Sequence, residues 1–181
     1  MLKIIALGGS DSAKSINKKL AVYAANQVKN ATVTIVDLKE LGLPMFGIDE
    51  ETANGIPENA HKLNRQIKTC DGLVISLAEH NGCYSAAFKS VYDWLSRING
   101  KVWQNKPMLL MGTSPGARGA RSVIGIALTG FPRLGGNIVA DFSFPSFEDN
   151  FSDNKITNAE LQAVLDSKIK LFEKELSNTI L

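Results

Sequence analysis

The sequence contains little of what disulfide-rich and membrane-spanning proteins require. It has only two cysteines, Cys70 and Cys83. Two cysteines this far apart do not make the disulfide framework of a small secreted domain, so we expect both to be reduced thiols. No apolar run reaches the roughly 18 residues of a membrane-spanning helix, and an apolar strand follows Met1 without a charged leader. These absences predict a cytoplasmic protein that does not contact a membrane.

The sequence also has no large excess of either charge and contains few histidines. The 20 basic and 18 acidic residues give a formal net charge of +2, and no block of lysine or arginine occurs, so nucleic acid is not expected as a partner. His80 with Cys83 supplies only two of the four ligands of a structural zinc site, so we expect no metal. A nucleophilic Cys83 would need a nearby base, and the other histidine, His61, falls on a separate helix.

What the chain does contain is a regular alternation of apolar strands and amphipathic helices. Its 181 residues, 44% of them hydrophobic, suffice for one full-sized core, and we expect a single domain over residues 1–181. Five segments have the pattern of strands: Leu2–Leu7, Thr32–Asp37, Leu73–Leu77, Pro107–Met111 and Asn137–Phe142. Apolar residues at helical spacing predict five helices. The residues expected on the buried sides of the first four are Ile16, Leu20, Ala24 and Val28; Ala60, Leu63 and Ile67; Phe88, Val91, Tyr92 and Leu95; and Val123, Ile124, Ala127 and Leu128. The fifth helix is expected to start at a capping box of Thr157 and Glu160 and to bury Leu161, Val164, Leu165, Ile169, Phe172 and Leu176.

Strands that alternate with helices predict an α/β fold with a parallel sheet. Each parallel crossover needs a helix to return the chain, so we expect three layers, with helices on both faces of a five-stranded sheet. One common order of such doubly wound sheets is 2-1-3-4-5, which we expect here. Ligands of such folds bind at the carboxyl ends of the strands, near the point where the strand order reverses. Small-residue loops follow the first, third and fourth strands, which are neighbours in this order, so the three loops should form one rim.

The first of these loops has the composition of an anion-binding site. Residues 8–17 bring two glycines and the hydroxyls of Ser10, Ser12 and Ser15 to the start of a helix. Backbone N–H groups and the positive end of the helix dipole favour a phosphate there. The loop lacks the Gly-Lys-Ser/Thr ending of a nucleoside triphosphate loop and the spacing of the dinucleotide fingerprint, which leaves a site of monophosphate size. The alternative is that these residues only cap the helix and shape a turn.

The second and third loops are suited to lying along a flat ligand. Residues 78–85 include His80, Asn81 and Gly82, which can present backbone groups to a heterocycle, with Tyr84 or His80 stacking on it or packing elsewhere. Residues 112–119 are rich in glycine and hydroxyls, and Arg118 and Arg121 either meet a phosphate or remain solvated. We expect the long connection Leu38–Gly55 to line a site, to form a subunit contact or only to join two elements.

Three ordered motifs resemble the NADPH-dependent FMN reductase family, over roughly residues 1 to 140. Residues 9–17 (Gly-Ser-Asp-Ser-Ala-Lys-Ser-Ile-Asn) resemble the family's Gly-Ser-Leu-Arg-x-x-Ser-x-Asn. Residues 78–84 (Ala-Glu-His-Asn-Gly-Cys-Tyr), with Lys89 and Asp93-Trp94-Leu95, resemble Pro-Glu-Tyr-Asn-Gly-Ser-Tyr before a helix with Lys and Asp-Trp-Leu. Residues 114–120 (Ser-Pro-Gly-Ala-Arg-Gly-Ala) resemble Ser-Pro-Gly-x-x-Gly-Gly, and residues 43–49 resemble Leu-Pro-x-Phe-x-x-Asp.

The chain departs from the family's pattern at several positions in these motifs. Ser12 replaces an arginine, which removes a cation suited to a phosphate, although Lys14 lies nearby. His80 replaces a tyrosine, Ala78 a proline and Ala120 a glycine.

The resemblance implies a flavodoxin-like fold and an enzyme that uses FMN as cofactor and NADPH or NADH as co-substrate. Electrons would pass by ping-pong hydride transfer through FMN to a quinone, flavin, azo compound or similar small-molecule acceptor, with no side chain as an obligatory acid or base. A homodimer or homotetramer is also implied, with a contact through the helix bearing Tyr92 and Trp94 and the loop around Phe46, unless those aromatics are core. The implied FMN-binding residues are Ser10, Ser12, Ser15, Ile16 and Asn17 at the phosphate; Ala78, Glu79, His80, Asn81 and Gly82 at the pyrimidine side; and Thr113, Ser114, Pro115, Gly116 and Gly119 along the other edge.

Two other functions fit the same fold. One is a flavodoxin-type electron carrier, but such carriers usually have a threonine-rich phosphate loop and an acidic surface. The other is a regulatory module that binds a nucleotide or a protein without turnover.

Overall fold

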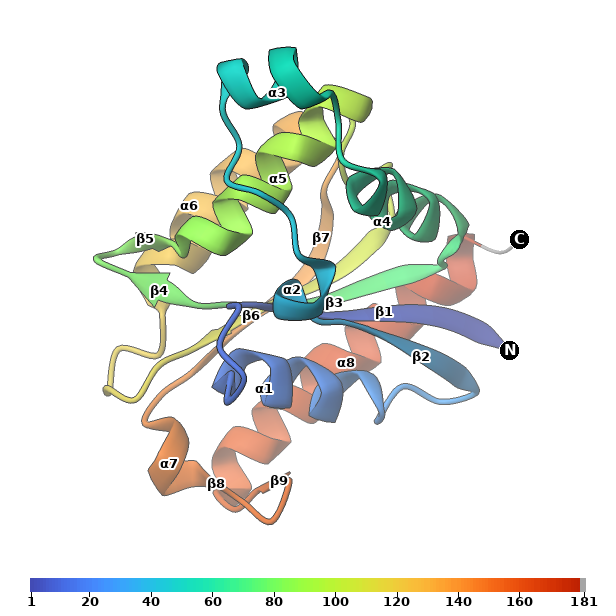
Figure 1. Ribbon diagram of the computed structural model, residues 1–181. Coiled ribbons are helices and arrows are strands. Elements are labelled where there is room, and N and C mark those ends of the chain that lie inside the picture. Colours follow the sequence, from blue (N-terminus) through green and yellow to red (C-terminus); the bar gives the residue numbers. More distant parts are fainter. Residues whose placement is uncertain (180–181) are drawn as a thin grey trace.

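The computed structural model describes residues 1–179 and contains a central parallel sheet between two helical layers (Figure 1). The five strands are β1 (Leu2–Gly9), β2 (Ala31–Val36), β3 (Gly72–Leu77), β6 (Pro107–Thr113) and β7 (Asn137–Phe144). They pair in the order β2-β1-β3-β6-β7, which is order 2-1-3-4-5 when only the strands of this sheet are counted. The predicted fold class and strand order are confirmed.

Alternating side chains of the strands build a separate core on each face. Ile5, Leu7 and Ile75 point to one face, and Ile4, Ala6 and Val74 to the other. Because successive side chains of a strand point to opposite faces, a continuous apolar run such as residues 4–7 fills both cores.

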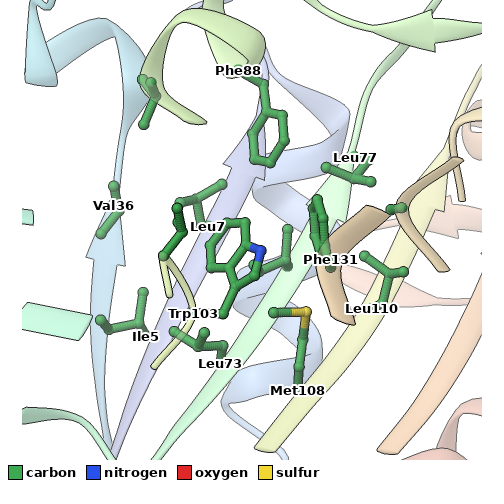
Figure 2. Close-up of a cluster of buried hydrophobic side chains, with 14 of the residues drawn as sticks. Ile5, Leu7, Val36, Leu73, Leu77, Phe88, Trp103, Met108, Leu110 and Phe131 are labelled. Atoms are coloured by element: carbon green, nitrogen blue, oxygen red, sulfur yellow. The ribbon is translucent and has the colours of Figure 1, made fainter. Parts of the chain in front are cut away.

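Three helices cover the first face, and they are α4 (Glu58–Thr69), α5 (Ala86–Ile98) and α6 (Arg121–Gly130). Trp103 and Phe131, at the centre of this core in Figure 2, are almost fully buried. Phe131 belongs to a 3₁₀ helix, η1 (Phe131–Leu134). The ring centroids of Trp103 and Phe131 lie 4.7 Å apart. Trp103 precedes β6 and Phe131 follows it in the chain, so connections on either side of β6 complete this core.

The opposite face is covered by α1 (Ile16–Ala25) and α8 (Ala159–Thr179). Helix α1 buries Leu20, Ala21 and Ala24, and the small alanines let it lie close to β1 and β3. Helix α8 buries Leu165, Ile169, Phe172 and Leu176 against the β6 and β7 side of the sheet.

Several predicted details of the helices are wrong. Helix α1 ends at Ala25, so Val28 is buried beyond its end. Leu128 and Val164 are 41% and 44% exposed, because each lies beside the buried stripe of its helix and not within it. The capping box of Thr157 and Glu160 does not form, since Asn158 Oδ1 accepts the backbone N–H groups of Glu160 and Leu161.

The connections contain more structure than the sequence predicted. The segment 38–55 holds two short helices, α2 (Leu38–Leu41) and α3 (Ile48–Asn54). The second small-residue loop is a hairpin of β4 (Glu79–His80) and β5 (Cys83–Tyr84). After β7 come α7 (Phe147–Asn150) and a hairpin of β8 (Phe151–Ser152) and β9 (Lys155–Ile156). Within residues 1–179, none of the helices has both the length and the apolar character needed to cross a membrane.

Candidate functional site

A cleft of about 180 Å³ lies where the three small-residue loops meet at the carboxyl ends of β1, β3 and β6. Twelve residues line it, and they are Ser10, Ser12, Lys14, Ser15, Ile16, Asn17, Ala78, Glu79, His80, Thr113, Ser114 and Pro115. The strand order reverses between β1 and β3, so this is the position where ligands of doubly wound sheets bind.

The first loop presents two unpaired backbone donors to the cleft. Ser15 caps α1 by accepting the backbone N–H of Lys18 through Oγ at 3.0 Å. The N–H groups of Ile16 and Asn17, both in residues that line the cleft, donate to no atom within residues 1–179. Such N–H groups at the start of a helix are favourable partners for an anion.

Gly8 allows the helix to start this close to the strand. A Cβ atom at Gly8 would lie 2.5 Å from both the backbone N and the Cα of Lys18. No real Cβ contact is that short, so a side chain here would push the first turn of α1 away from β1.

Asn17 ties the first loop to the two neighbouring strands. Its Oδ1 accepts the hydroxyl of Ser76 at 2.7 Å and the backbone N–H of Thr113 at 3.0 Å. Its Nδ2 donates to the Thr113 carbonyl at 3.1 Å. The side chain is buried, so the amide of Asn17 fixes the cleft wall while its backbone N–H remains unpaired.

The second loop is held over the end of β1 by its own side chains. The hydroxyl of Ser85 donates to the Gly9 carbonyl at 2.7 Å and accepts the N–H of Phe88, which caps α5. Glu79 Oε2 accepts the N–H of Val123 at 3.0 Å in the first turn of α6. The carboxylate of Glu79 therefore joins the second loop to α6.

Asn81 and Gly82 form the turn of this hairpin and do not line the cleft. Their φ angles of +52° and +79° are those of a two-residue turn, for which Asn-Gly is the preferred pair. Their contact with a ligand stays a prediction, and the hairpin turn is a local reason for the same dipeptide.

Tyr84 packs into the core. Its ring stacks on Phe131 with centroids 6.2 Å apart, and burial raises the pKa of its phenol. His80, by contrast, lines the cleft, so it is the ring of this loop that is placed to face a ligand.

The third loop contributes Thr113, Ser114 and Pro115 to the cleft, and its remaining residues turn away. The Gly116 carbonyl accepts the N–H of Ser146. Gly119 has φ of +56°, and a Cβ there would lie 2.6 Å from Ser143 Oγ, so it packs against the end of β7.

Neither arginine of this region lines the cleft. Arg118 donates to the hydroxyl of Ser122, in the first turn of α6, at 2.8 Å. Ala120, where the family has glycine, has φ of +59° just before α6, so the alanine occupies a left-handed conformation that favours glycine.

Neither thiol lines the cleft. Cys70 is buried, and burial raises the pKa of its thiol to about 11. Cys83 is exposed on β5. Both cysteines are free, as predicted.

A larger hollow of about 520 Å³ lies along the outer side of α1, away from the three loops. It is lined by Lys18, Lys19, Val22, Tyr23, Asn26, Gln27, Ile35, Asp37, Phe151 and Asn154. Its lining contains none of the small-residue motifs, and Lys18 and Asp37 neutralise each other in an ion pair. The smaller cleft is therefore the better candidate site.

Eleven of the fifteen residues predicted to bind a ligand line the cleft. The four that do not are Asn81, Gly82, Gly116 and Gly119. Lys14 lines the cleft but was not among the predicted residues, although its place between Ser12 and Ser15 was a usable signal.

Two relatives with similar sequences are both named as quinone reductases. The chain is 37% identical over 120 residues to a 2-hydroxy-1,4-benzoquinone reductase from Burkholderia, with 65% of this chain and 63% of the relative covered. It is 30% identical over 123 residues to a quinone reductase of Escherichia coli K12, with the same shares covered. The chain thus spans less than two thirds of the length of these relatives.

Solved structures share the fold. The flavoenzyme NAD(P)H:(acceptor) oxidoreductase FerB from Paracoccus denitrificans has a TM-score of 0.74 at 22% identity, with 96% of this chain and 98% of that chain covered. An FMN-dependent NADH-azoreductase from Bacillus anthracis, solved in complex with FMN, has a TM-score of 0.58 at 16% identity, with 98% and 99% covered. The sequence profile of the NADPH-dependent FMN reductases matches residues 2–149, and this chain belongs to that family.

Proposed function

We propose that this chain binds FMN in the cleft between the three loops and uses it to pass electrons from NADH or NADPH to a small-molecule acceptor. The observation that carries the proposal is the cleft itself, which brings the three family motifs together at the switch point of the sheet. The family membership and the names of the relatives support it.

The first loop fits the phosphate of FMN. The unpaired N–H groups of Ile16 and Asn17 and the hydroxyls of Ser10 and Ser12 are donors that suit a phosphate dianion. The loop lacks the Gly-Lys-Ser/Thr ending of a nucleoside triphosphate loop, because Ala13 precedes Lys14, so a monophosphate is the better match.

The other two loops fit a flat ring. Glu79 and His80 approach from one side, and Thr113, Ser114 and Pro115 from the other. The hydrogen bonds of Ser85 and Asn17 hold both loops at fixed positions relative to β1, so these residues orient the ring and limit its movement.

Bound FMN would supply the redox chemistry, taking a hydride equivalent from the nicotinamide and giving two electrons to the acceptor. The chain itself would bind and orient the reactants. We assign no side chain as acid or base, because the acidic group that lines the cleft, Glu79, already accepts the N–H of Val123. The four predicted site residues outside the cleft would act by shaping the hairpin and the third loop.

The test is an absorbance spectrum of the purified chain, before and after addition of FMN, followed by initial-rate assays with NADH or NADPH and a quinone. We expect a flavin spectrum, oxidation of the reduced nicotinamide, and parallel double-reciprocal lines that mark a ping-pong order. A chain that quenches no flavin fluorescence on titration would contradict the proposal.

The same assays separate the alternatives. A flavodoxin-type carrier would bind FMN but oxidise NADH or NADPH no faster than free FMN does. A regulatory module would neither oxidise NADH or NADPH nor reduce an acceptor. The acceptor class that we propose is a quinone, supported by the names of two relatives, and azo compounds and free flavins are the comparison substrates.

We further propose a homodimer or homotetramer. Met45, between α2 and α3, is 75% exposed and lines a hollow of about 330 Å³, and Ile48, at the start of α3, is 63% exposed. Trp94 is not available for such a contact, because it is buried and donates its Nε1 hydrogen to the Pro44 carbonyl at 2.9 Å. Size-exclusion chromatography with light scattering tests the assembly, and a monomer would contradict it.

A cytoplasmic location is part of the same proposal. It is supported by the unpaired state of Cys70 and Cys83, which suits a reducing compartment. Cell fractionation with antibody detection is the measurement that checks it.

A further inference from the structure

The charged groups that line the cleft are few. Lys14 is the cation among the twelve lining residues, and Glu79 is the carboxylate. Among residues 1–179 Lys14 and Glu79 form no ion pair, and Glu79 Oε2 accepts the Val123 N–H.

The other cations near the start of α1 either form an interaction within the protein or lie outside the cleft. The ammonium of Lys18 forms an ion pair with Asp37. Lys19 lines the separate hollow along α1. Arg118 donates to Ser122 and does not line the cleft.

Lys14 has no such partner. Among residues 1–179 its ammonium takes part in no ion pair and no hydrogen bond. Its backbone is held in place, since its N–H donates to Ser12 Oγ at 3.2 Å and the N–H of Ser15 donates to the Ser12 carbonyl at 3.0 Å. An exposed lysine on an ordered turn, at the edge of a cleft that offers several N–H and O–H donors, is suited to meet a phosphate dianion.

We infer that Lys14 is a specificity-determining residue that favours a flavin with a phosphomonoester tail, so that its charge adds to the preference of the cleft for FMN over riboflavin. The inference rests on the proposed function and assigns a role that the loop's hydroxyls do not have, because hydroxyls bind a phosphate without neutralising it. A lysine contributes a point charge and not the bidentate grip of an arginine, so the selectivity should be moderate and sensitive to salt.

The test is titration of the full chain and its variants with FMN and with riboflavin, followed by quenching of flavin fluorescence. We expect Lys14→Gln to weaken FMN binding about tenfold, the scale of one charge-assisted contact of an exposed lysine, and to leave riboflavin binding within about twofold. Lys14→Arg should bind FMN at least as tightly as the unchanged chain.

The matched control is Lys19→Gln, which removes the same charge one turn into α1 but outside the cleft. It should leave the affinities for FMN and riboflavin as they are in the unchanged chain. Rising salt should weaken FMN binding to the unchanged chain more than to Lys14→Gln, because only the former retains the charge.

The outcomes separate the two proposals. If the unchanged chain binds FMN and Lys14→Gln binds it equally well, or loses FMN and riboflavin in equal measure, the role of Lys14 is wrong and the proposed function stands. The role of Lys14 is also wrong if Lys19→Gln has the same effect, since the charge would then act without position. A chain that binds neither flavin would overturn both.

Discussion

At the scale of single residues, Asn17 decides how the first loop meets the rest of the site. Its amide joins Ser76, 59 positions away, and Thr113, 96 positions away, in three buried hydrogen bonds. The family resemblance implies that Asn17 lies at the phosphate. In the structure its side chain fixes the loop, because both ends of the amide are already paired.

Replacement of Asn17 by alanine should therefore be costly. It leaves the N–H and carbonyl of Thr113 and the hydroxyl of Ser76 buried without this partner, and each unsatisfied group costs about 1–3 kcal/mol. We expect Asn17→Ala to lower the free energy of unfolding by about 3 kcal/mol or more in urea titrations. Ser76→Ala, which removes one of the three bonds, should cost about 1 kcal/mol. Equal losses in the two variants would contradict the role of the amide as a joint between strands.

Gly8 is the second residue whose identity the structure explains. Gly8→Ala should destabilise the chain by about 3 kcal/mol, because the added methyl group meets the backbone of Lys18 at 2.5 Å and α1 must shift. Gly116→Ala is the matched control in the third loop, where an added Cβ meets nothing within 4 Å and φ is not positive. Thermal unfolding followed by circular dichroism compares them, and a stable Gly8→Ala chain would show that β1 and α1 can separate without cost.

At the scale of elements, the ion pair of Lys18 and Asp37 connects α1 to α2. Asp37 also caps α2 by accepting the N–H of Lys39 at 3.0 Å. The sequence pattern predicted a loop over the whole of residues 38–55. The four-residue helix α2 was not predicted, because it is too short for its periodicity to be recognised. The contacts of Asp37 with α1 and the hydrogen bond from Trp94 Nε1 to the Pro44 carbonyl show that the segment is anchored.

Asp37 makes this anchor dependent on pH. Partial burial favours its neutral form, but the Lys18 ammonium and the backbone N–H of Lys39 outweigh burial and hold the pKa of the carboxyl below its ordinary value of 3.8. A depressed pKa adds stability above the unfolded value, and this stability is lost as pH falls through the folded value. We expect Asp37→Asn to lower the free energy of unfolding by about 1 kcal/mol at neutral pH.

The difference between Asp37→Asn and the unchanged chain should then shrink as the pH falls below about 3.8, because Asp37 becomes neutral in both states. Urea titrations at neutral and acidic pH measure it. A difference that stays constant with pH would mean that Asp37 acts through shape and not through charge.

At the scale of the whole molecule, α8 completes a core that the family match leaves open. The profile match ends at residue 149, whereas Leu165, Ile169, Phe172 and Leu176 of α8 cover β6 and β7. Gly72 at the start of β3 lies directly against Phe172 and Leu176, where a Cβ would come within 2.7 Å of each. The helix is therefore fitted closely to the sheet.

This close fit leads us to propose that residues 1–181 form one domain. The full chain should unfold in a single cooperative transition when circular dichroism and tryptophan fluorescence are compared, since both cores share the same strands. A chain truncated after residue 158 should lose that transition, because β6 and β7 lose the helix that covers them on one face of the sheet. Independent folding of the truncated chain would contradict the single-domain proposal.

The sequence by itself determined the α/β fold class, and its motifs predicted the strand order and the position of the candidate site. Apolar runs such as residues 4–7 and 73–77 specify buried parallel strands, and a parallel sheet places the loops after β1, β3 and β6 at one edge. These conclusions depend on periodicity and on the order of elements, which are local properties of the chain.

Only the tertiary structure decided which side chains face the cleft. It showed that Asn17 joins three elements, that Tyr84 packs on Phe131, that Asn81 and Gly82 form a hairpin turn, and that Lys14 lines the cleft without an ion-pair partner among residues 1–179. Each of these facts depends on contacts between residues far apart in the chain or on the direction of one side chain. Local patterns do not specify them, because the same residue types serve equally well in a turn, a core or a binding site.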